Sequence, residues 1–136
     1  MFTANMDGCS FGYGSKTGTG EVLVSHANAD GVGAQAEAAA LQSNPSPDMA
    51  LLKGRAAQMV RQAEMLEKKM QPGTLRTLSP TDYGDPFHGG VEGDPDVYKY
   101  AATVVGLREN GSWRFLCQRR VITTSGQYVL RDVIDI

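Results

Sequence analysis

The last forty residues constrain the fold most strongly, because a tight hairpin turn separates two long alternating segments there. The turn is Glu109-Asn110-Gly111-Ser112, and Asn-Gly readily adopts the positive φ angles that a two-residue hairpin needs. Val97 to Leu107 precedes this turn and Trp113 to Thr123 follows it. A second turn, Ser125-Gly126, leads into a third segment, Gln127 to Ile134. Residues 97–136 are therefore predicted to form an antiparallel β-meander.

A helical segment is predicted over residues 31–70. The sequence SNPSPD starts its main helix, since Ser46 can cap the first turn and Pro47 suits the first helical position. The face predicted to be buried carries apolar residues at steps of three and four: Leu52, Ala56, Met59, Val60, Ala63, Leu66 and Met70. The lysines and arginines on the other face predict a solvated surface or, alternatively, a partner-binding one. The alanine-rich residues 31–42 suit a shorter helix.

Residues 2–26 are predicted to form two or three short strands, with GYGSKTGTG as the turn between them. Alternation from Glu21 onward places His26 at the end of a strand, on the same side as two valines that we expect to be buried. Strands, then helices, then strands predict an α+β fold with mostly antiparallel sheet. The 136 residues fit a single catalytic domain, in which residues 71–96 would be a long ordered loop.

Charge and composition exclude several classes of function. The net charge is −2, which provides no general attraction to nucleic acid or to an anionic membrane surface. No run approaches the roughly 18 apolar residues that a membrane-spanning helix needs. The first ten residues, MFTANMDGCS, lack the basic and apolar regions of a secretory signal. We therefore expect a cytoplasmic protein, or one exported without a cleaved signal that acts in the cytosol of a target cell.

The two cysteines have different sequence environments. Two are too few for a disulfide framework in a chain of this length. Cys117 shares one face of an alternating strand with Trp113 and Phe115, which predicts a small buried hydrophobic residue. Cys9 lies among glycines and polar residues, where an apolar core explains little. Cys9 is therefore the candidate for chemistry.

A cysteine hydrolase needs a thiolate, a base that takes its proton and a group that orients the base. Gly8 leaves room for a substrate beside Cys9, and the backbone N–H groups of Cys9 and Ser10 could form an oxyanion hole. His26 follows across an expected hairpin and could serve as the base, provided that its imidazolium lowers the pKa of the thiol. Thr3, on the preceding strand, could orient the imidazole through its hydroxyl or its carbonyl.

Thr3, Asp7-Gly8-Cys9 and Ser25-His26-Ala27 resemble the catalytic pattern of the cysteine–histidine glutamine deamidases. This group includes the chemoreceptor glutamine deamidase of bacterial chemotaxis, the catalytic domain of cytotoxic necrotizing factor and the Burkholderia lethal factor. The resemblance covers about the first 27 residues and implies Cys9 as nucleophile, His26 as general base and Thr3 as the orienting residue. It also implies a layered α/β-sandwich. The chain departs from the family at Asp7, where an apolar or small residue is usual and where an inward-facing carboxylate would raise the pKa of the thiol.

The resemblance predicts a protein-glutamine deamidase, a cysteine-dependent hydrolase that acts on a protein bearing a target glutamine. Such a domain would be a bacterial effector or toxin involved in virulence. The alternatives are a non-catalytic α+β binding, adaptor or immunity-type module, a cysteine peptidase or amidase, and a transglutaminase if an amine replaces water. The sequence leaves the target protein and the oligomeric state open.

His88 lies in the expected long loop, where it is either a surface histidine, a substrate contact or an alternative base. No metal and no cofactor are expected. The neighbouring aspartates lack the regular spacing of a calcium-binding loop, and the two cysteines and two histidines are too scattered for a structural zinc site.

Overall fold

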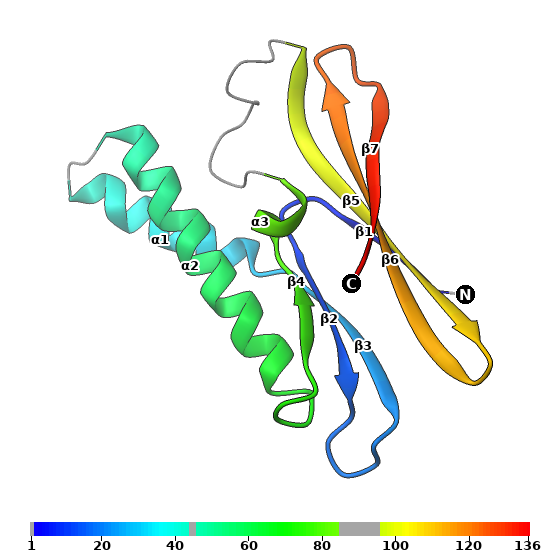
Figure 1. Cartoon of the computed structure of the whole chain (residues 1–136). Coiled ribbons are helices and arrows are strands. Elements are labelled where there is room, and N and C mark those ends of the chain that lie inside the picture. The colour runs from blue at the N-terminus through cyan, green and yellow to red at the C-terminus, as the bar shows by residue number, and fades with distance from the viewer. Residues whose placement is uncertain (1, 44–45, 85–95) are drawn as a thin grey trace.

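The computed structural model describes residues 2–43, 46–84 and 96–136, with the side chains from Met6 onward. Three layers are visible in Figure 1: two helices, a small sheet and a larger sheet. The helices are α1 (Asp30–Gln42) and α2 (Pro47–Glu67). The small sheet has the order β3-β2-β4, and its strands are β2 (Ser10–Ser15), β3 (Val22–Ala27) and β4 (Arg76–Leu78).

The larger sheet has the order β1-β5-β6-β7 and is antiparallel throughout. Its strands are β1 (Phe2–Met6), β5 (Val97–Glu109), β6 (Ser112–Thr123) and β7 (Tyr128–Asp135). Asn110 and Gly111 form the predicted tight turn, with φ values of 51° and 83°. The predicted α+β class, the layered sandwich, the helical insertion after the first strands and the C-terminal β-meander are all confirmed.

The hydrophobic core lies between the two sheets. Its fully buried side chains come from both layers and from the segment after β4: Met6, Phe11, Leu78, Tyr83, Ala102, Val104, Phe115 and Cys117. The rings of Phe11 and Phe115 lie 5.8 Å apart, which links the small sheet to the large one. Cys117 is completely buried, so its predicted role as a small hydrophobic residue is confirmed.

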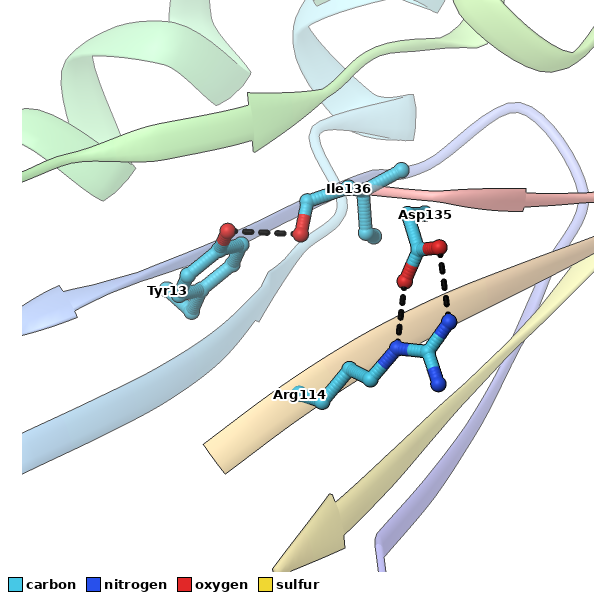
Figure 2. A network of polar contacts seen from close by, with 4 residues as sticks. All are labelled: Tyr13, Arg114, Asp135 and Ile136. Atoms are coloured by element: carbon cyan, nitrogen blue, oxygen red, sulfur yellow. Dashed lines mark hydrogen bonds and ion pairs between the residues drawn. The ribbon is translucent and has the colours of Figure 1, made fainter. Parts of the chain in front are cut away.

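Polar contacts at the C-terminal end of β7 also join the two sheets (Figure 2). The hydroxyl of Tyr13, on β2, donates to the carbonyl of Ile136 at 2.6 Å. Beside it, Arg114 of β6 forms a two-pronged ion pair with Asp135 of β7, at 2.7 and 2.8 Å. The side chains of this ion pair are more than half exposed, so it contributes little to stability. The Tyr13 contact ties the small sheet to the residue that follows β7.

Helix α2 begins as predicted, because the side chain of Ser46 accepts a hydrogen bond from the N–H of Met49 at 3.3 Å. Its buried face agrees with the predicted stripe at Leu66, and Met70 just beyond the helix is also buried, but the rest of the face differs. Three members of the expected apolar stripe, Ala56, Val60 and Ala63, are exposed. The buried row consists instead of residues four apart: Ala50, Gly54, Gln58, Gln62 and Leu66. Apart from Leu66 near its C-terminal end, helix α2 therefore buries small and polar residues.

Close approach to α1 explains this choice of face. A Cβ atom added to Gly54 would lie 2.8 Å from the carbonyl oxygen of Gly33 on α1, so a larger residue would push the helices apart. The valine and alanines of the expected stripe point away from this contact. The helix also ends earlier than predicted, at Glu67 in place of Met70. Within the described ranges, no helix is both long and apolar enough to cross a membrane.

Two further expectations about the chain path need correction. The segment GYGSKTGTG was expected to be a turn, but β2 continues through it as far as Ser15. Residues 71–96 were expected to be one long loop, but their described part contains β4 and a short helix, α3 (Pro80–Tyr83). Pairing with β2 explains β4, since its three residues complete the small sheet. The propensity of three residues could not have revealed that pairing.

Candidate functional site

The candidate site is the turn from Asp7 to Ser10, which carries the chain from β1 in the large sheet to β2 in the small one. Gly8 has a φ of 82°, in the left-handed region that favours glycine. Cys9 follows it and is only 8% exposed, so it is more buried than its polar surroundings in sequence suggest. The thiol is directed at the carbonyl oxygen of Asp7, 4.0 Å from the sulfur.

The carbonyl oxygen of Gly8 accepts hydrogen bonds from two glutamine side chains of α2. Nε2 of Gln62 lies 2.9 Å from this oxygen, and Nε2 of Gln58 lies 3.4 Å from it. The other end of the Gln62 amide accepts a hydrogen bond from the hydroxyl of Ser10 at 2.7 Å. Gln62 is fully buried and Gln58 nearly so. The two amides therefore hold the turn from the side of α2.

The Gln58 amide is itself fixed by two further partners. Its Nε2 also donates to Oδ1 of Asp30 at the start of α1, at 2.6 Å. Its Oε1 accepts from the guanidinium of Arg55 at 3.2 Å. No polar side-chain atom that is buried in the described part of the chain lacks a hydrogen-bond partner. This amide cluster is thus a saturated network, which is the form in which buried polar groups stabilise a structure.

Tyr83, the last residue of α3, holds the turn from the opposite direction. Its hydroxyl donates to the carbonyl oxygen of Cys9 at 2.8 Å, and the side chain is almost completely buried. Burial raises the pKa of this hydroxyl, so it remains a proton donor at any physiological pH. The carbonyls on both sides of Cys9 are therefore anchored, one by α2 and the other by α3.

The predicted base, His26, lies near the end of β3. The cross-strand register pairs Ser10 with Ala27 and Phe11 with His26, so Cys9 and His26 each lie one residue from the Ser10–Ala27 pair, in a diagonal relationship. Cys9 itself precedes β2 and lies just outside the paired residues of this ladder. In the part of the chain that the structure describes, no hydrogen bond joins the thiol to this imidazole. The histidine is exposed. Of the two valines expected to be buried on its side of the strand, Val24 is half-buried and packs against the core, whereas Val22 is 51% exposed.

The remaining predicted site residues are Thr3, His88, Gly8 and Ser10, and only the last two are seen to lie in the candidate site. Thr3 lies on β1, where its backbone is in register with Val105 of β5, so it belongs to the larger sheet and not to the sheet of His26. The side chain of Thr3 is not among those described. His88 lies outside the described residues. Gly8 and Ser10 are both in the candidate site, and Ser10 is the first residue of β2.

The environment of Cys9 favours the protonated thiol. Burial is the main cause that raises its pKa above the usual 9.0, and a hydrogen bond from the backbone of Asp7 partly offsets this rise. The negative charges of Asp30 and Asp7 raise the pKa further. In the described part of the chain, no contact with the imidazole of His26 lowers the pKa of this thiol, so the Cys9–His26 pair stays a prediction.

The Asp7 side chain, which departs from the family pattern, lies at the surface. Its carboxylate is 57% exposed and forms an ion pair with Lys99 of β5. Among the charges that raise the pKa of Cys9, Asp7 comes after Asp30. The aspartate before Gly8 is therefore accommodated at the surface and does not crowd the sulfur.

Sequence reasoning missed Gln58, Gln62, Tyr83 and Asp30. A usable signal was the spacing of the two glutamines, since residues four apart on a helix lie on the same face. No sequence pattern linked Tyr83 to Cys9, because only the fold brings this tyrosine to the turn. Among the described residues, no cluster of three or more histidine, cysteine, aspartate or glutamate side chains could hold a metal ion. Comparison with protein-family models, curated proteins and solved structures finds no match to this chain.

Proposed function

We propose that this protein is a protein-glutamine deamidase, with Cys9 as nucleophile and His26 as general base. The observation that carries the proposal is the register of β2 and β3, which puts both residues beside the same cross-strand pair, Ser10–Ala27. The likeness of the segment 3–27 to the cysteine–histidine deamidases supports the same roles. It also supports an effector or toxin domain acting in a target cell's cytosol.

The raised pKa of the Cys9 thiol indicates how such a reaction would begin. Neutral His26 first takes the thiol proton, and the resulting thiolate attacks the carboxamide carbon of the substrate glutamine. The carbon–sulfur bond forms as the carbonyl becomes an oxyanion, and the imidazolium then gives its proton to the departing ammonia. Water, deprotonated by His26, hydrolyses the thioester to glutamate and restores the thiol.

Exposure of His26 is compatible with this order of events. The side chain lies on β3, the edge strand of the small sheet, and in the described part of the chain no hydrogen bond or ion pair fixes its ring. A change of rotamer on substrate binding would bring the ring toward the sulfur, since both residues adjoin the Ser10–Ala27 pair. Catalytic contacts often tighten only in the substrate complex.

The test is mass spectrometry of a cytosolic extract incubated with the full chain. Deamidation raises the mass of a glutamine peptide by about one dalton, and heavy-oxygen water labels the new carboxylate. We expect this product with the native chain and with Cys117→Ala, and none with Cys9→Ala or His26→Ala. Cleaved peptides would instead indicate a peptidase, and incorporation of an added amine would indicate a transglutaminase. Unchanged deamidation by Cys9→Ala would refute the proposal.

The second candidate is a non-catalytic binding module. The observation that favours it is the edge strand β7, where four apolar side chains are 46% to 60% exposed: Tyr128, Val129, Leu130 and Val133. An exposed apolar edge strand is a common docking element. A stable complex with an extract protein that survives in Cys9→Ala but is lost in Val133→Asp, without any modified glutamine, would favour this module over the enzyme.

A further inference from the structure

The two buried glutamines of α2 have a role that the proposed reaction does not yet include. A helix face packed on a sheet ordinarily carries apolar side chains, because an amide gains little from burial. Here Gln58 and Gln62 are 3% and 0% exposed, and both donate to one backbone atom, the carbonyl oxygen of Gly8. That oxygen belongs to the peptide group whose N–H is contributed by Cys9.

The orientation of this peptide decides where the Cys9 N–H points. The described chain contains no cis peptide bond, so the N–H of Cys9 points in the direction opposite to the Gly8 carbonyl. The left-handed conformation of Gly8 also matters, since a flip of this peptide is easiest next to a glycine. The amides fix the carbonyl toward α2 and so turn the N–H of Cys9 away from it.

We infer that Gln62, assisted by Gln58, is a positioning residue that holds the Cys9 N–H as the oxyanion donor of the site. This inference rests on the proposed cysteine chemistry. An N–H held in advance stabilises the developing charge without any reorganisation during the reaction. Gln62 has the larger role, because its donor distance is 2.9 Å against 3.4 Å for Gln58. Ser10 anchors the other end of the Gln62 amide and keeps its nitrogen directed at Gly8.

The inference separates two reactions of the same sulfur. Acylation by p-nitrophenyl acetate passes through a tetrahedral oxyanion: a carbon–sulfur bond forms, p-nitrophenolate leaves, and the thiol proton passes to His26 or to water. Alkylation by iodoacetamide displaces iodide directly and forms no oxyanion. Both reactions need the thiolate, so a change in thiol pKa or access affects both rates. Only a change in the oxyanion donor affects acylation selectively.

The experiment measures both second-order rate constants on the full chain carrying Cys117→Ala, so that Cys9 is the only thiol. For Gln62→Met, we expect acylation to slow by about tenfold or more while alkylation changes by less than about twofold. Gln58→Met should show the same selectivity with a smaller effect, and it provides the test if Gln62→Met fails to fold. The matched control is Leu66→Ala, a cavity one turn along the same buried face, which should leave the ratio of the two rates unchanged.

Equal loss of acylation and alkylation in both glutamine variants would overturn the inference, since the amides would then only support the fold. Unchanged acylation would overturn it as well. Failure of the proposed function has a different signature, because the rate ratio would still respond to Gln62→Met while the native chain produced no deamidated peptides.

Discussion

Phe11 and His26 lie directly opposite each other on β2 and β3, yet the phenyl ring is fully buried and the imidazole is exposed. The difference follows from position in the sheet, since β2 is the central strand and β3 is an edge strand. Phe11 reaches the core between the sheets, where it meets Phe115. The imidazole stays exposed to solvent, one residue along β3 from Ala27, the partner of Ser10.

The two cysteines should differ in reactivity. Cys9 is 8% exposed, whereas Cys117 is completely buried and its burial raises the pKa of its thiol to about 11. We expect iodoacetamide at neutral pH to label Cys9 at least about tenfold faster than Cys117. Peptide mass spectrometry over a time course measures both rates. Slow labelling of both thiols at equal rates would contradict this prediction and would favour the binding module.

Removing one charge should make Cys9 more reactive. Asp30 is the charge that contributes most to the raised pKa of this thiol, and Asp30→Asn removes it while retaining an oxygen that can accept from Gln58. The pKa of Cys9 should fall, and its alkylation rate at pH 7 should rise by about two- to threefold. Asp48→Asn, an exposed aspartate at the start of α2, is the matched control and should have no effect. An unchanged rate in Asp30→Asn would show that burial alone sets the pKa.

Two glycine substitutions should have opposite effects on stability. Gly8→Ala places a side chain at a φ of 82° and should reduce the free energy of unfolding by about 1–2 kcal/mol, although the nearest atom leaves space for a methyl group. Gly31 lies in α1, and beyond its own helix backbone and chain neighbours no atom lies within 4 Å of an added Cβ. Gly31→Ala should therefore raise the free energy of unfolding by about 0.5–1 kcal/mol. Urea denaturation measures both. A neutral Gly8→Ala would mean that the turn relaxes to another conformation.

Stability should decline in alkaline solution because of Cys117. Its thiol has a pKa of about 11 in the folded chain against 9.0 for an ordinary thiol. Between these values the unfolded chain releases the proton more readily, so raising the pH favours unfolding. The contribution is present below pH 9 and is lost by about pH 11, a change of about 1–2 kcal/mol.

Comparison of the native chain with Cys117→Ala isolates this contribution, since the other titrating groups are common to both. The free energy of unfolding of the variant should fall less between pH 8 and pH 10.5. Parallel curves for the two proteins would show that Cys117 titrates normally in the folded state.

Much of the fold could be predicted because its signals are local. The Asn110-Gly111 turn, the Ser46 cap and the alternation around Cys117 each depend on a few neighbouring residues, and each is confirmed. The buried face of α2 could not be predicted from hydrophobicity, because close contact with Gly33 selects Gly54 and the glutamines in place of Val60. The β4 strand was missed for a similar reason, since its pairing with β2 is a tertiary event.

The candidate site was predicted in part. Gly8, Cys9 and Ser10 could be selected because Cys9 lies among glycines and polar residues, where an apolar core explains little. The supports of that turn come from residues at least fifty positions from the backbone groups that they contact, Gln58, Gln62 and Tyr83, and only the fold reveals them. The contribution of His26 remains a prediction, since adjacency in the register does not by itself join the imidazole to the sulfur.

The amides of Gln58 and Gln62 also determine where α2 can lie relative to the turn from Asp7 to Ser10. An all-leucine face could slide by one turn or rotate slightly and still bury the same apolar area. Gln58 and Gln62 satisfy their hydrogen bonds in only one position of the helix. A shift would leave the buried Gly8 carbonyl and Ser10 hydroxyl without partners. These hydrogen bonds therefore fix the position of α2 relative to the turn. Substitutions along this helix should be tolerated mainly on its solvent-exposed face.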